Sequence, residues 1–512
     1  MGGTTIAESL RDARIALRSA WYDAALELLD GCEDWPSDER ESAIVMKAEA
    51  LGRRDPVGAV AYLTSVQDLP ASAAGRFNFA IEFGKAHAGV RDFSSAASRY
   101  EEARALAGEV IHGNHTMAYH DLRMRWLRRE CDVTAPEVAL AIAHPDPDIA
   151  AAAYAYRAWL HAGNGNYVGH VADLRKCLEY VTLPTAEPID VVTFATSVHA
   201  LAQTAFETAD EDGIAAARAA MQAINWTPGV AAHQFLAMRA MGWDAFMRGR
   251  AGEAQWMFKD ARALAPSAAM RITTHADRAY VARMSRNEAW AIDELAEADR
   301  LAYDVPWESI SGEDRVVLVI LAVLHAPHDA ARAQRYASKF SQIGTENVDP
   351  KVDLHGNRRA IGHAKYAQGR IEQTLGRRDA AVTLLHEAYA IFEGVAYHYR
   401  ATLAAAALAE LTGEAKWREA STRHAAFYPD CPLATYADEA VAREEALPPV
   451  LSPFQRQVAR ALWTGAEPTE LSRRFSRSMY TIQHQIEAVF DAFGVGSRGA
   501  LLQEARRRGL AA

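Results

Sequence analysis

The chain has 512 residues, which exceeds one ordinary domain and predicts two or more folded units. Half of its residues are hydrophobic and 24% are charged, a balance typical of a globular protein and not of a disordered one. The net charge of −11 is uneven: the residues from Leu451 onward carry nine arginines, no lysine and five acids, hence +4, which leaves −15 for the rest. A basic segment on an acidic body suggests a polyanion partner for that segment only.

The cysteine pattern and the absence of long apolar runs bear on the cellular compartment. The four cysteines lie far apart without a CxxC pair, which argues against a zinc site or a disulfide framework. No apolar run approaches the roughly 18 residues of a membrane span, and the N-terminus lacks the basic and apolar regions of a signal peptide. We therefore expect a cytoplasmic protein without a membrane partner. The cysteines are Cys32, Cys131, Cys177 and Cys431.

Residues 1–430 are expected to form one helix after another, because Ala, Leu, Arg and Glu dominate and apolar residues recur at a spacing of three or four. Helices end in small or glycine-containing residues, and the clearest example is residues 88–93. Several such glycines, at positions 52, 89, 163, 376 and 413, lie about 37 residues or twice that apart. This period predicts about ten to twelve helical hairpins stacked into a solenoid, whose small residues let paired helices approach closely. The alternative is an irregular all-α domain without true repeats.

The hairpin pattern resembles degenerate tetratricopeptide (TPR) repeats, most clearly in residues 80–104 and 364–392. A solenoid of this kind presents a concave surface, and its usual ligand is a peptide or a partner helix. Breaks in the pattern predict long loops near 144–147 and 344–349 and a further break at 184–188. A helix over about 434–447 is expected before Pro448-Pro449, which cannot continue a helix. The predicted domains are therefore a repeat domain (1–430), a connecting helix and linker (431–450) and a C-terminal domain (451–512).

The C-terminal domain is expected to contain four short helices with clear start and stop signals. The starts are Ser452-Pro453 with Gln455 completing a capping box, then Pro468, Ser478 and Ser497, and the stops are Gly465 and Gly494. The third helix carries apolar residues at spacings of 4, 3 and 4, namely Ile482, Ile486, Val489 and Phe493. Short helices joined by a tight turn, followed by a helix with a polar outer face, predict a helix-turn-helix (HTH) unit.

The order of residues in this domain resembles a known family. The residues are Leu451-Ser452-Pro453, Arg456, Val458, Leu462, Gly465, Glu470-Leu471, Ser478, Thr481-Ile482, Ile486, Gly494-Val495 and Ser497-Arg498. Together they resemble the DNA-binding domain of LuxR/NarL-type bacterial transcription regulators. The resemblance implies double-stranded DNA as a partner and a homodimer formed through residues 498–510. Where the family usually has Lys and His, this chain has Gln483 and Gln485.

The residues expected to contact DNA lie on and before the third helix, because the second helix of an HTH motif enters the major groove. Gln483 can pair with adenine, His484 can donate to a guanine or a phosphate, and Tyr480 and Thr481 are placed to reach a phosphate. Arg473, Arg474 and Arg477 supply positive charge, and Arg498 matches the family's Ser-Arg pair. The alternative is that these residues are a solvated helix face, with Arg473 or Arg474 paired to Glu470.

Signatures of catalysis and cofactor binding are missing from the sequence. The nearest candidate for a phosphate loop, Gly84-Lys85, lacks the first glycine and sits in a helical pattern. No nucleophile elbow or metalloprotease motif is present. The spacing of His112, His115 and His120 does not put all three on one helix face, so no metal site is expected. We expect no enzymatic activity and no cofactor.

Two hypotheses for function follow from these patterns. The first is a DNA-binding transcription regulator whose repeat domain binds a protein or small ligand and controls the C-terminal HTH. The second is a repeat scaffold for protein interactions with a degenerate HTH that does not bind DNA, motivated by Gln483 and Gln485. Salt dependence and sequence selectivity of DNA binding separate the two.

Overall fold

The computed structural model describes residues 5–128, 130, 132–180, 190–285, 287–307, 316–326, 329–346, 358–431, 446–463, 466–475, 477–508 and 510. Every regular element in these ranges is a helix, so the predicted all-α class is confirmed. Within the same ranges, no helix is both long and apolar enough to cross a membrane. Contacts divide the chain into two compact units, residues 1–205 with 211–240 and residues 206–210 with 241–512.

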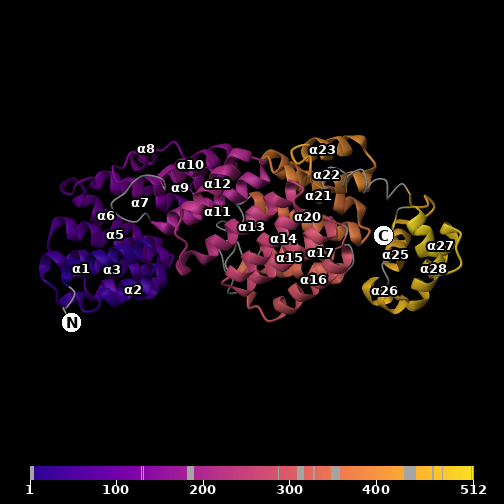
Figure 1. Ribbon diagram of the computed structural model, residues 1–512, viewed down its shortest axis with the longest axis horizontal. Coiled ribbons are helices and arrows are strands. Elements are labelled where there is room, and N and C mark those ends of the chain that lie inside the picture. The colour runs from indigo at the N-terminus through magenta and orange to yellow at the C-terminus, as the bar shows by residue number, and fades with distance from the viewer. Residues whose placement is uncertain are drawn as a thin grey trace. The chain divides into compact units, whose positions relative to one another are not determined.

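The first unit is built from helices that pack in consecutive pairs, α1 with α2 through α9 with α10 (Figure 1). The connections within the α1–α2, α3–α4, α5–α6 and α9–α10 pairs are short, so the second helix of each pair returns alongside the first. The helices are α1 Ile6–Arg18, α2 Tyr22–Leu28, α3 Ser37–Arg54, α4 Pro56–Ser65, α5 Ala73–Gly89, α6 Phe93–Leu106, α7 Gly113–Leu127, α8 Pro136–Ile142, α9 Pro147–Gly163, α10 Tyr167–Glu179, α11 Val191–Glu207, α12 Glu211–Ala223 and α13 Ala231–Met247. The C-terminal residues of α11 and of α13 belong to the second unit.

The second unit continues the pairing, with α15 against α16, α17 against α18, α20 against α21 and α22 against α23. Among the residues that the structure describes, four further helices follow these pairs at the C-terminus. The helices are α14 Ala251–Leu264, α15 Ala268–Met284, α16 Glu288–Tyr303, α17 Val316–His325, α18 Ala330–Glu346, α20 Arg358–Thr374, α21 Arg378–Gly394, α22 His398–Thr412, α23 Ala415–Ala425, α25 Pro453–Trp463, α26 Pro468–Phe475, α27 Met479–Phe493 and α28 Arg498–Arg507.

In three hairpins, a glycine of the first helix lets a bulky side chain of the second helix approach closely. A Cβ on Gly84 would lie 2.6 Å from the Tyr100 ring, and one on Gly242 would lie 2.8 Å from the Phe258 ring. A Cβ on Gly369 would lie 2.7 Å from the side chain of Leu385. In all three cases the bulky residue follows the glycine by the same interval along the chain, so the three hairpins share one packing solution. This is the close approach that the small residues of the sequence predict.

The turns between paired helices often use a left-handed residue. Gly249, Gly376 and Gly413 have φ near +73 to +75°, a conformation that costs glycine little. Ala20 and Arg91 adopt φ of 57° and 62° at equivalent turns, where no glycine marks the position. The helix end predicted near Gly52 is confirmed, because α3 ends at Arg54 and α4 begins at Pro56.

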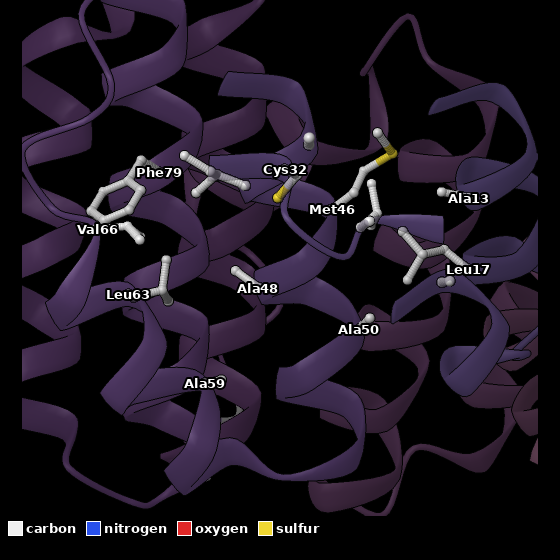
Figure 2. Close-up of a cluster of buried hydrophobic side chains, with 14 of the residues drawn as sticks. Ala13, Leu17, Cys32, Met46, Ala48, Ala50, Ala59, Leu63, Val66 and Phe79 are labelled. Carbon is white, nitrogen blue, oxygen red and sulfur yellow. The ribbon is translucent and has the colours of Figure 1, made fainter. Parts of the chain in front are cut away.

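The core of the first hairpins is a layer of small and medium apolar side chains contributed by α1 to α5 (Figure 2). Leu17, Met46, Leu63 and Phe79 come from four different helices and are each at most 8% exposed. The thiol of Cys32 is buried in this core. Burial of such side chains stabilises a fold by about 1.5–3 kcal/mol each, so this layer holds the hairpins together.

Some sequence predictions concern connections and segments outside these helices. The loop predicted near 144–147 is a short link between Ile142 and Pro147, not a long loop. Residues 184–188, 347–349 and 432–445, which include most of the predicted connecting helix, lie outside the described residues, as do Cys131 and Gly465. The domain boundary at Pro448-Pro449 stays a prediction.

Candidate nucleic-acid interface

The four C-terminal helices begin at the predicted N-terminal signals, and α27 ends at the predicted glycine. Ser452 and Gln455 form a reciprocal capping box at the start of α25, with N···O distances of 2.8 and 3.3 Å. The hydroxyls of Ser478 and Ser497 accept from the amides of Thr481 and Ala500 at 3.1 and 3.2 Å and so cap α27 and α28. Gly494 ends α27 with φ of 67°. These predicted caps are confirmed.

These helices share a hydrophobic core of their own, and α27 contacts α25, α26 and α28. The inward residues predicted for α27 are all buried, with exposures between 0% and 9% for Ile482, Ile486, Val489 and Phe493. The side chain of Ser472 donates to the carbonyl of Arg477 at 2.6 Å and fixes the turn between α26 and α27. The core therefore determines which face of α27 is turned outward.

The outward face of α27 is polar, exposed and without internal partners. Tyr480 is 79% exposed, and Gln483, His484 and Glu487 are exposed as well. None of the four side chains makes a hydrogen bond or an ion pair to another described residue. Amide, imidazole and phenol groups in this state are free to bond to an external ligand.

Other residues proposed to contact DNA have different surroundings. Arg473 and Arg477, before α27, are exposed, whereas the side chain of Arg474 lies outside the described residues. The hydroxyl of Thr481 lies 2.9 Å from that of Ser478 in the N-terminal cap, so it can still present its hydrogen outward.

Arg498 is held within the protein. Its Nε donates to the Leu462 carbonyl at 3.1 Å and its Nη1 to Glu467 at 2.5 Å. These bonds tie the start of α28 to the C-terminal end of α25, where a helix leaves carbonyls without partners. The position of Arg498 is thus explained by the fold, and its predicted DNA contact would compete with these bonds.

The predicted dimer segment, residues 498–510, contains α28. Leu501 and Ala505 are buried in the C-terminal core, while Gly499 and Gln503 face outward. Hydrogen bonds from Arg507 and Arg508 lower the pKa of Glu504 to about 2, so these two cations are engaged along their own helix. Residues 509, 511 and 512 lie outside the described residues.

Two contacts that the sequence did not predict join α25 to the preceding helices of the same unit. Gln457 donates to the carbonyl of Gln373 at 3.4 Å, and Arg460 lies 3.5 Å from Glu410. The carboxylate of Glu410 is also 3.5 Å from Arg370. No local pattern marks these residues, because the contacts join positions far apart in the chain.

The histidines considered for metal binding do not form one cluster. The ring of His120 stacks on that of Tyr100, whereas His112 and His115 lie 6.2 Å from the ring of His144. Both nitrogens of His144 are engaged, by the Asp146 amide at 3.0 Å and by Thr116 at 3.1 Å. No group of three or more potential ligands close enough for a metal ion occurs in the described part of the chain.

Comparison with known proteins adds no further identification. No protein-family model matches the chain, and no curated protein matches it.

Proposed function

We propose that the chain is a DNA-binding transcription regulator that reads double-stranded DNA with the outward face of α27. The observation that carries this proposal is the set of exposed, unpartnered polar side chains on that face, Tyr480, Gln483 and His484. They stand on a small helical unit with its own core, after a turn with exposed arginines. The resemblance of this unit to LuxR/NarL-type HTH domains supports the same function.

The proposed contacts divide into those that specify sequence and those that position the protein. The Gln483 amide can bond to N6 and N7 of adenine, and His484 can donate to a guanine acceptor. Arg473, Arg474 and Arg477 supply phosphate contacts, whose binding releases counterions. Tyr480 and Thr481 add hydroxyl donors for the backbone. Arg498 would have to release Glu467 to take part.

The helices before this unit are proposed to be a TPR-like repeat solenoid that binds a protein or small ligand. The support is the paired helices and the shared glycine contacts of Gly84, Gly242 and Gly369. Such a surface recognises its ligand with the inner helices of consecutive hairpins. From the resemblance of the C-terminal helices to LuxR/NarL-type regulators, we propose that the protein is bacterial and cytoplasmic.

Control of DNA binding is proposed to pass through the contacts of α25. Glu410 contacts both Arg370 of α20 and Arg460 of α25, so a shift of α20 against α22 would change how α25 is held. Dimerisation through residues 498–510 would then align two copies of α27 on one duplex. Bacterial regulators of this type bind as dimers, which is the basis for this part of the proposal.

Selection from random duplex DNA with the full chain tests the proposal. We expect one sequence motif to be enriched and its affinity to fall steeply between about 50 and 200 mM salt. Gln483→Ala should relax the preference at one base pair, and Gln67→Ala, at an exposed glutamine of the first unit, is the matched control. If no motif is enriched and salt has no effect, the alternative of a repeat scaffold with a non-binding HTH is supported instead.

A further inference from the structure

The helix proposed to read DNA carries no lysine or arginine. Its acidic residues are Glu487 and Asp491, both exposed. The exposed arginines lie before it, Arg473 on α26 and Arg477 in the turn between α26 and α27. The commonest specific contact in the major groove, from Arg or Lys to guanine, is therefore not available to α27. A base preference of this helix has to come from its neutral and acidic side chains.

The core of the C-terminal helices holds Glu487 on the outward face of α27. Ile486, next to it, is only 9% exposed, and Val489 is fully buried. Glu487 itself is exposed and follows Gln483 by four residues. Residues with this spacing lie on the same side of a helix, about 6 Å apart along its axis. Glu487 and Gln483 therefore face the same external ligand.

The carboxylate of Glu487 has no cation to neutralise it among the described residues. It makes neither a hydrogen bond nor an ion pair to any of them. The residues four positions before and after it on α27 are Gln483 and Asp491, so an ion pair along the helix cannot form. A carboxylate only accepts hydrogen bonds, so the group that it binds must be a donor.

The four bases differ in the donors that they present in the major groove. Cytosine presents its N4 amino group, and adenine presents its N6 amino group beside the N7 acceptor. Guanine and thymine present only acceptors there, which repel a carboxylate. Phosphates repel it as well, because the charges have the same sign. Cytosine is therefore the base that fits a carboxylate best.

We propose that Glu487 determines specificity by accepting a hydrogen bond from the N4 amino group of a cytosine, one or two base pairs from the adenine bound by Gln483. The spacing of about 6 Å along α27 corresponds to about two steps of 3.4 Å along a DNA strand. This contact rests on the proposed function, since it forms only if α27 enters the major groove. It adds the base that this position selects.

Selection from random duplex DNA with the full chain and with Glu487→Gln tests the contact. An amide pairs with N6 and N7 of adenine, so the variant should select adenine in place of cytosine at one position of the motif. Gln483→Ala relaxes the preference at its own base pair and so locates the neighbouring adenine. In fluorescence anisotropy, the unmodified chain should prefer the cytosine duplex over the adenine duplex about tenfold, and Glu487→Gln should reverse that preference.

A matched variant and two other outcomes complete the test. Glu27→Gln makes the same chemical change at an exposed glutamate of α2 and should leave the motif unchanged. If Glu487→Gln keeps the original motif and only binds all duplexes more tightly, Glu487 acts through its charge alone and the cytosine contact is refuted. If the unmodified chain enriches no motif, the proposed DNA-binding function fails, and the Glu487 contact fails with it.

Discussion

Polar side chains of the α9–α10 hairpin are bonded to each other within the fold, whereas those on the outward face of α27 are exposed. In the hairpin, Arg157 makes two hydrogen bonds to Asp173, at 2.6 and 2.7 Å, and Asp173 is only 5% exposed. The Nδ1–H of His170 donates to the Ala158 carbonyl at 2.8 Å. On α27, Gln483 and His484 are exposed and bond to no described residue.

The difference separates polar groups that hold the fold from polar groups that are free to bind. A buried polar group that loses its partner costs the full desolvation penalty, whereas an exposed one is solvated by water. Substitutions in the hairpin should therefore change stability, and substitutions on α27 should change only binding.

Removal of the Asp173 carboxylate should have the largest effect. Asp173→Ala leaves Arg157 without its partner between α9 and α10, and breaking a buried pair costs about 3 kcal/mol or more. Urea unfolding followed by circular dichroism measures the change. The exposed pair of Lys176 and Glu179 on the same helix is the control, and Lys176→Ala should leave the transition nearly unchanged.

Acid should destabilise the hairpin through His170. Burial lowers the pKa of His170 from 6.5 to about 4, so between these values the unfolded chain binds a proton that the folded chain does not. The contribution of neutral His170 to the free energy of unfolding is therefore fully present above pH 6.5. It decreases by on the order of 3 kcal/mol as the pH drops toward 4. Unfolding measured from pH 7 to pH 4 should give a flatter profile for His170→Gln. Equal slopes for both proteins would contradict this prediction.

Arg498 should behave as a structural residue of the C-terminal helices. Arg498→Ala removes the bonds to the Leu462 carbonyl and to Glu467. Because the group is partly exposed, we expect a loss near the lower end of the range for a charged hydrogen bond, about 1.5 kcal/mol. Thermal unfolding should show the loss. A variant with unchanged stability and weakened DNA binding would instead support the DNA contact predicted from the family resemblance.

Exposed residues of the proposed DNA interface, such as Arg473 on α26, should have the smallest effect on stability. Arg473→Ala should change the free energy of unfolding by less than about 0.5 kcal/mol, as is usual for exposed positions. It should reduce the slope of log affinity against log salt by about 1 and weaken binding to all sequences alike. Fluorescence anisotropy at several salt concentrations measures the slope, and an unchanged slope would remove Arg473 from the interface.

The C-terminal helices were predicted from sequence more fully than the repeat region because their signals are local. Ser452, Ser478, Gly494 and Ser497 act within one helical turn, and each performs the predicted role. The spacing of Ile482, Ile486, Val489 and Phe493 sets the inward face in the same way.

Positions that depend on distant parts of the chain were not predictable by this route. The turn at residues 88–93 was predicted from Gly89, but its left-handed residue is Arg91, which the sequence pattern did not indicate. The bonds of Arg498 to Leu462 and Glu467 join separate helices, so the sequence pattern alone suggested a DNA contact.

The affinity ratio for two duplexes tests the central claim most directly. The full chain would be titrated, at about 150 mM salt, with the duplex enriched by selection and with a scrambled duplex of equal length and composition. A regulator that reads bases through α27 should prefer the enriched duplex by about a thousandfold or more, and Gln483→Ala should reduce that ratio. A ratio near one would contradict sequence-specific DNA binding by this protein.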